Sequence, residues 1–199
     1  MNPQIKIKFN KFLSPIFTDW IHQHDKWKNW KEPTQGEIDT KVKLFNAVWD
    51  KKGDEILTKM QKFTGLNFKR NIIDVHIVAG NPRAFNFPIV LKSNLTEDEF
   101  ITILTHELTH TLQSDNDVDY ISYWKSKYPK ETNTTLNHIV TYAALRHIFK
   151  GSMTLLKIKK EADNHSTNEY TRAWEIVVKE GYGEIAKQLR ILRHSISVV

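Results

Sequence analysis

Two histidines four residues apart, with a glutamate directly after the first, are the residues of this sequence best suited to chemistry. His106, Glu107 and His110 follow the pattern His-Glu-x-x-His. On a helix, side chains four residues apart point the same way, so both imidazoles can reach one metal ion from one face. Glu107 would then lie close enough to act as a general base on a water bound to that metal. The pattern predicts a catalytic zinc site.

The residues around this motif predict that it lies on a helix. Thr96 can cap the first turn, and Glu99 can return a hydrogen bond to the amide of the cap residue, while Leu95 and Phe100 can form a hydrophobic staple. The histidines fall at the margin of one apolar arc, so we expect them to line the wall of a cleft. The arc consists of Phe100, Ile101, Ile103, Leu104, Leu108 and Leu112. The alternative interpretation is that both histidines are structural and bind no metal.

A catalytic zinc ion usually has three protein ligands and one open position for water. The strongest candidate for the third ligand is His138, because its segment is apolar on most sides and predicts a buried helix. A buried imidazole needs partners for its nitrogens, and either zinc or a backbone group can serve. The competing candidates are Glu175, on a helix predicted near the C-terminus, and Glu131, in a polar stretch.

Two further residues share the segment of His138. Tyr142 lies one turn later, where its hydroxyl could donate to the oxyanion of a tetrahedral intermediate; its alternative role is packing. His147 falls on a different side of the helix from His138, and we expect it to be exposed.

Residues 96–110 resemble the active-site helix of the zincin metallopeptidases, in which His-Glu-x-x-His supplies two zinc ligands and the catalytic glutamate. The resemblance implies a zinc peptidase fold and assigns roles only to His106, Glu107 and His110. A glutamate as third ligand would be similar to the gluzincin branch. The metzincin branch is excluded, because its motif continues to a glycine and a third histidine, whereas this chain continues with Thr111-Leu112-Gln113.

Length and composition favour one compact domain. The chain has 199 residues, 40% of them hydrophobic, and no cysteine. Disulfides and thiolate ligands are therefore excluded, and zinc would need nitrogen or oxygen ligands. We expect an α+β, zincin-like domain over 1–199, with a small mixed sheet and backing helices in 1–95, the active-site helix in 96–114, and a helical part in 115–199.

The charge pattern gives weaker information about partners. The net charge is +6, but the lysines are scattered, which favours a solvated surface over a nucleic-acid site. Trp20, Trp27 and Trp30 could stack on bases, but we expect them to seal an edge of the core. The sequence contains no run that predicts a signal peptide or a membrane span, so we expect a cytoplasmic protein without a membrane partner.

Three segments have the composition of strands. Residues 4–9 alternate apolar and polar side chains, and 71–79 are rich in β-branched residues. Residues 85–91 contain Pro88, which cannot donate to a ladder, so we expect this strand at the sheet edge. There it could hold a peptide substrate by strand addition, or it could simply be an edge that binds nothing. A helix should begin at the Thr34–Glu37 capping box and end before Gly65.

These features together predict a zinc-dependent peptidase with Glu107 as the general base. Two alternatives remain open at this level. The chain could be a non-catalytic binding or regulatory protein on a zincin scaffold, acting on nucleic-acid-bound partners. It could also be a metal-dependent hydrolase of non-peptide amides, because a metal-activated water attacks any accessible carbonyl.

Overall fold

The computed structural model describes residues 1–199 except 25, 26, 28, 82, 117, 153, 156, 157, 160, 161, 163–166 and 197–199. The described residues form a mixed α+β structure with a small sheet, as predicted. They divide into two compact units: unit 1 comprises Met1–Glu55 and Arg70–Thr111, and unit 2 comprises Ile56–Lys69 and Leu112–Val199. That the whole chain is one domain stays a prediction. Within the described residues, no helix is both long enough and apolar enough to cross a bilayer.

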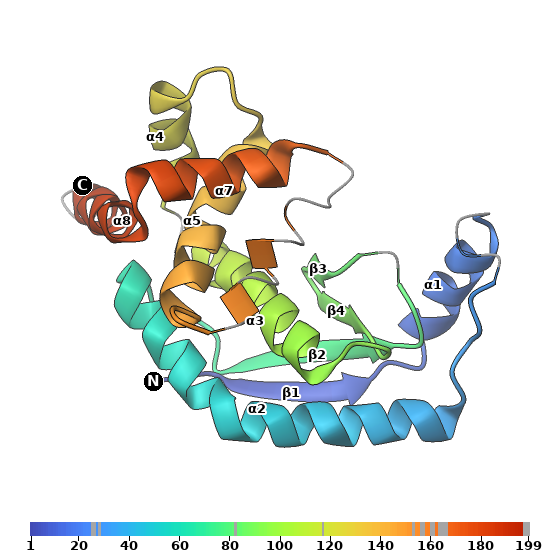
Figure 1. The fold of residues 1–199 in the computed structure, drawn as a ribbon. Coiled ribbons are helices and arrows are strands. Elements are labelled where there is room, and N and C mark those ends of the chain that lie inside the picture. The colour runs from blue at the N-terminus through green and yellow to red at the C-terminus, as the bar shows by residue number, and fades with distance from the viewer. Residues whose placement is uncertain are drawn as a thin grey trace. The chain divides into compact units, whose positions relative to one another are not determined.

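The elements follow one another as drawn in Figure 1. The strands are β1 (Gln4–Phe9), β2 (Ile72–Val78), β3 (Phe85–Asn86) and β4 (Ile89–Lys92). The helices are α1 (Leu13–His22), α2 (Gln35–Thr64), α3 (Glu97–Ser114), α4 (Tyr120–Lys127), α5 (Asn133–Ile148), α7 (Glu169–Glu180) and α8 (Tyr182–Ile196).

The sheet of unit 1 has the strand order β1-β2-β4-β3. β1, β2 and β4 are parallel, and β3 pairs with β4 antiparallel, so the sheet is mixed as predicted. Along β2 the side chains of Ile73, Val75 and Ile77 are buried, whereas those of Ile72 and Asp74 are exposed. One face of β2 therefore packs on the core, while the opposite face is exposed at the start of the strand and becomes buried at Val78.

The prediction of one edge strand over 85–91 is wrong in one respect. It is two short strands, β3 and β4, separated by a turn at Phe87 and Pro88. β3 forms the edge of the sheet, because Ile89 and Val90 of β4 are paired on both sides, with β2 and with β3. The proline interrupts the ladder, as expected from its missing N–H, but the chain reverses there and does not continue as one strand.

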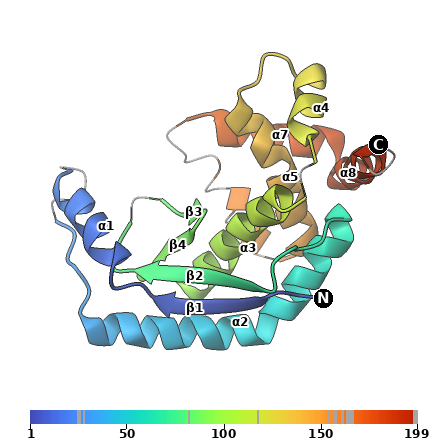
Figure 2. The ribbon, with the colours of Figure 1, turned by 180° about the vertical axis from the view of Figure 1, so that it is seen from behind.

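Helices α2 and α3 pack on each other in unit 1. The rings of Phe45 in α2 and Phe100 in α3 stack with their centroids 4.2 Å apart, and both side chains are fully buried. Asn46 in α2 donates to the carbonyl of Ile7 in β1 over 3.2 Å. Both views show α2 running alongside β1 (Figures 1 and 2). The helix α3 is therefore anchored through aromatic contact to the scaffold of the same unit.

The predicted limits of α2 are confirmed. Its first turn is closed by the Thr34 amide, which donates to the Glu37 carboxylate over 2.7 Å, and by the Glu37 amide, which donates back to Thr34 Oγ1 over 3.3 Å. It ends at Thr64, and Gly65 follows with a φ of 72°. This left-handed conformation is accessible to glycine at little cost and terminates the helix.

The helix α1 was not predicted from the sequence. The side chain of Asn10 accepts from the amides of Phe12 and Leu13, both over 3.0 Å, and so begins the helix. Trp30, from the tryptophan-rich segment after α1, lies against Gly80, where an added Cβ would be 2.6 Å from its ring. Trp30 therefore packs at the edge of the core, as predicted. Trp20 stacks instead on the ring of His24, with centroids 3.9 Å apart, and is 37% exposed.

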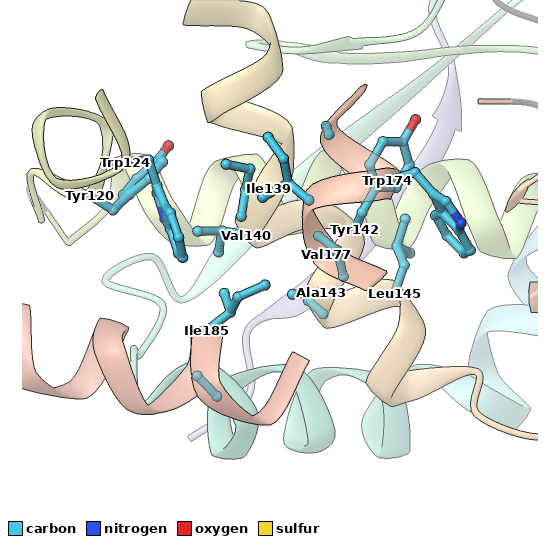
Figure 3. Close-up of a cluster of buried hydrophobic side chains, with 14 of the residues drawn as sticks. Tyr120, Trp124, Ile139, Val140, Tyr142, Ala143, Leu145, Trp174, Val177 and Ile185 are labelled. Atoms are coloured by element: carbon cyan, nitrogen blue, oxygen red, sulfur yellow. The ribbon is translucent and has the colours of Figure 1, made fainter. Parts of the chain in front are cut away.

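The core of unit 2 is built around α5, which packs against α4, α7 and α8. Figure 3 shows Ile139, Val140 and Ala143 of α5 among side chains from these neighbours. Most α5 side chains are buried, so the predicted buried helix over this segment is confirmed. A helix that is apolar on most sides must be enclosed by others, and this enclosure fixes the position of its few polar residues.

Glu180 links the ends of α4 and α7 within unit 2. Its carboxylate accepts hydrogen bonds from Lys127 Nζ and from the Tyr128 hydroxyl. Burial opposes the ionised form, but these hydrogen bonds outweigh it and leave the pKa of Glu180 below its ordinary value of 4.5. A lowered pKa means that the carboxylate stabilises the fold above about pH 4.5, and that this contribution is lost as the pH falls through the folded-state pKa.

We therefore expect Glu180→Gln to lower the free energy of unfolding at pH 7 by about 1–2 kcal/mol. The difference from wild type should shrink as the pH falls below about 4.5, because the wild-type carboxylate is then protonated. Urea unfolding of both proteins at a series of pH values measures this. A difference that stays constant down to the lowest pH at which both proteins fold would contradict the assignment.

Candidate metal centre

The helix α3 begins as the sequence predicted. The amide of Thr96 donates to the Glu99 carboxylate over 2.8 Å, and the amide of Glu99 donates back to Thr96 Oγ1 over 3.3 Å. The apolar arc is confirmed in its main members: Phe100, Ile101, Leu104, Leu108 and Leu112 are all buried, while Ile103 is half-buried. The cap and the arc fix both the start and the rotation of the helix, and these determine where its histidines point.

His106 and His110 lie one turn apart on α3, and their rings converge. Their Nε2 atoms are 3.1 Å apart, and their ring centroids are 4.9 Å apart. Two nitrogens bound to one tetrahedral zinc at 2.0–2.1 Å would be separated by about 3.3 Å. The observed separation is therefore close to the spacing that two zinc ligands require. His110 is 8% exposed and His106 is half-buried, so the pair is largely shielded from solvent.

Glu107 follows His106 and is also 8% exposed. Its backbone carbonyl accepts from Thr111 Oγ1 over 3.1 Å, which adds a contact within the helix. Acidic side chains are rarely buried unless they have a specific partner or role. The burial of Glu107 therefore distinguishes it from Glu97 and Glu99, which are exposed in the first turn of the same helix.

His138 lies in the second turn of α5, is 8% exposed and makes a defined hydrogen bond within unit 2. Its Nδ1 is 2.7 Å from the carbonyl oxygen of Thr134. A carbonyl only accepts, so Nδ1 carries the proton, and Nε2 is the nitrogen that can offer a lone pair. A backbone acceptor on one imidazole nitrogen is the usual arrangement for a histidine that binds metal through the other.

His106, His110 and His138 form a group that could hold a metal ion, and we call this histidine group the metal group. Each offers one ring nitrogen, and these three atoms all lie within 4.8 Å of one another. No other group of three or more histidine, cysteine, aspartate or glutamate ligands with this property occurs among the residues that the structure describes. The three histidines that the sequence selected as ligands are thus the three that the structure brings together.

The competing third ligands belong to a different cluster in unit 2. Arg172 pairs with Glu175, whose side chain is 53% exposed. Arg172 also donates to Glu131 over 2.7 Å. These two hydrogen bonds hold the pKa of Arg172 above its ordinary value. Neither glutamate belongs to the histidine group, and ion pairing with the half-buried Arg172 is sufficient to account for both.

Tyr142 and His147 have different surroundings from each other. Tyr142 is 5% exposed, and its ring lies 5.9 Å from that of His138 and 5.7 Å from that of Trp174, measured between centroids. Its proposed contact with an oxyanion stays a prediction. His147 is half-buried and stacks on Phe63 with centroids 4.7 Å apart, so the prediction that it is exposed is wrong.

The surroundings of His147 give it a structural role. Burial lowers the pKa of its imidazole, and the nearby cations of Lys59, Lys150 and Arg190 lower it further. The neutral ring packs between Phe63 and Tyr182, the latter with centroids 5.8 Å away. The reason for the wrong prediction is that neighbouring helices cover this side of α5, which a single helix wheel cannot show.

Sequence analysis missed two groups that contact His138. One is the carbonyl of Thr134, and the other is the ring of Tyr170 in α7, with its centroid 4.5 Å from that of His138. The carbonyl could have been found, because a buried histidine needs an acceptor and the residue four positions earlier on a helix lies within reach. Tyr170 could not, because its contact depends on how α5 and α7 pack.

Comparisons of the chain with protein-family models, with curated proteins and with solved structures found no match. The assignment of function therefore depends on the residues of the site.

Proposed function

We propose that this chain is a zinc-dependent peptidase in which His106, His110 and His138 hold the ion and Glu107 is the general base. The observation that carries the proposal is the convergence of three histidine nitrogens within 4.8 Å, with a buried glutamate next to the first of them. The resemblance of residues 96–110 to the zincin active-site helix gives the reaction class.

The donor set suits zinc. Three neutral imidazoles leave a fourth tetrahedral position for water, which is the arrangement of catalytic zinc sites. Calcium and magnesium prefer oxygen ligands, and a site of three nitrogens disfavours both. The hydrogen bond from His138 to Thr134 supports the same conclusion, because it keeps Nε2 unprotonated for ligation.

In the proposed hydrolysis, zinc, Glu107 and Tyr142 have separate roles. Zinc bound at this site would lower the pKa of a coordinated water towards 7 and polarise the substrate carbonyl. Glu107 accepts a proton from the attacking water and passes it to the departing amine nitrogen. Its burial keeps bulk water from competing for that proton. Tyr142 would donate a hydrogen bond to the oxygen that gains negative charge.

The substrate proposal is narrower than the sequence suggested. An extended peptide could pair with the outer edge of β3, but only Phe85 and Asn86 belong to that strand. Ile89 and Val90 of β4 are paired on both sides, with β2 and with β3, so they cannot accept a further strand, whereas Leu91 is paired with β2 alone. Main-chain pairing with β3 would hold about two substrate residues, and side-chain contacts would have to supply the remaining affinity.

Metal removal tests the proposed function. We expect the purified chain to cleave casein or a mixed peptide library, to lose this activity on treatment with 1,10-phenanthroline, and to recover it when one equivalent of zinc is added. The control is a parallel sample treated with the non-chelating 1,7 isomer. Hydrolysis that continues unchanged in metal-free protein would exclude the proposed mechanism.

The same assay separates the two alternatives. A protein that binds zinc but cleaves no peptide, and instead hydrolyses small acyl amides, would be an amide hydrolase. A protein with neither activity and with affinity for nucleic acid that falls steeply with salt would fit the non-catalytic alternative.

A further inference from the structure

The imidazole of His138 is contacted from a second helix as well as from its own. We propose that Tyr170, at the start of α7, is a positioning residue that holds the His138 ring in the orientation required for metal binding. This inference rests on the proposed function, because it assumes that His138 is a ligand. All the contacts that carry it lie within unit 2.

The first turns of α5 and α7 are joined by two hydrogen bonds. Thr132, the N-cap residue of α5, donates through Oγ1 to the Glu169 carboxylate over 2.6 Å. Thr135 Oγ1 donates to the backbone carbonyl of Glu169 over 3.2 Å. Thr132 also accepts from the Thr135 amide over 3.2 Å, so one residue both caps α5 and holds α7. These contacts fix the backbone of Glu169 relative to the turn that precedes His138.

Tyr170 follows Glu169, so this link determines where its ring lies. Its centroid is 4.5 Å from that of the His138 ring, with the planes inclined at 59°. The ring of Tyr142 lies farther from that of His138, with centroids 5.9 Å apart. Tyr170 is half-buried, and its contact with the His138 ring gives it a route by which to act on the metal site.

Two contacts of different kinds therefore restrain one imidazole. The hydrogen bond from Nδ1 to Thr134 selects the tautomer, and the ring of Tyr170 restricts rotation of the imidazole plane about the Cβ–Cγ bond of His138. A ligand held in its productive orientation loses less conformational entropy when the metal binds. Removing a group that orients a metal ligand typically lowers metal affinity 10–100-fold.

The test compares Tyr170→Leu with Tyr170→Phe. We expect the leucine variant to bind zinc 10–100-fold more weakly than wild type and the phenylalanine variant to bind it within about threefold, because the ring and not the hydroxyl restrains His138. Affinity is measured by competition with a chromophoric chelator. The visible spectrum of the cobalt-loaded protein gives a second measurement, because its d–d bands report ligand geometry and do not respond to stability alone.

The matched control is Tyr182→Leu. Tyr182 is likewise half-buried in unit 2 and tilts against a histidine, His147, which is not part of the metal group. We expect this variant to lose a similar amount of stability while keeping both the zinc affinity and the cobalt spectrum of wild type. Thermal unfolding of all variants without metal measures stability separately.

The outcomes separate this inference from the proposed function. Wild type that binds no zinc would overturn both. Wild type that binds zinc, with Tyr170→Leu folded and equal to it in affinity and cobalt spectrum, would overturn the inference alone. If Tyr170→Leu does not fold, Glu169→Ala decides the question, because it removes the carboxylate that holds α7 to Thr132. We expect it to weaken zinc binding in the same direction, and an unchanged affinity would then contradict the role of Tyr170.

Discussion

Replacing Glu107 with glutamine is expected to lower peptide hydrolysis by about 10³-fold and to leave the bound zinc in place. General-base catalysis typically contributes 10²–10⁴-fold, and the amide of glutamine cannot accept the proton of the attacking water. Glutamine has almost the same volume, so the packing around this buried position should be preserved. The measurement is kcat/KM on a fluorogenic peptide together with zinc content by elemental analysis.

The control for this substitution is Glu97→Gln. Glu97 lies in the first turn of the same helix, is exposed, and is not a member of the metal group. It should keep wild-type activity. Equal activity in wild type and Glu107→Gln would remove Glu107 from the mechanism, even if zinc were present.

The second large effect is expected from His110→Ala. Zinc sites in small folded peptides bind with about 10–16 kcal/mol, so loss of one ligand in three should cost several kcal/mol and weaken zinc binding more than 100-fold. His110 is the residue whose Nε2 lies 3.1 Å from that of His106, so the substitution leaves no second ligand on α3. Competition with a chelator of known affinity measures the change.

His76 provides the comparison for His110. It lies on β2, where its Nδ1 is 3.1 Å from the Asn10 side chain, and it is outside the metal group. His76→Ala should bind zinc as wild type does. If both alanine substitutions weakened zinc binding to the same degree, zinc would be binding to histidines in general, and α3 would carry no specific site.

The part of the site that could be predicted from sequence is the part set by local interactions. The start of α3 follows from Thr96 and Glu99, and the shared direction of His106 and His110 follows from helix periodicity. His138 was found by a different argument, that a buried imidazole must have partners. One partner proved to be the Thr134 carbonyl, one helical turn before His138.

What the sequence could not supply depends on packing between elements. The helix α1 was missed because its buried residues include the polar Ser14 and Thr18, while the apolar Phe12 and Ile16 are exposed. Its hydrophobic pattern therefore does not mark the side that faces the core. Likewise, the reversal of the chain near Pro88 turned one expected edge strand into two strands, only one of which is at the edge.

The most direct test of the central claim is X-ray absorption at the zinc edge of the purified chain, with the metal counted in the same sample. We expect one zinc per chain, bound by three imidazole nitrogens at about 2.0–2.1 Å and one oxygen ligand. A chain that takes up no zinc, or a zinc ion whose scattering shows fewer than two imidazoles, would contradict that claim.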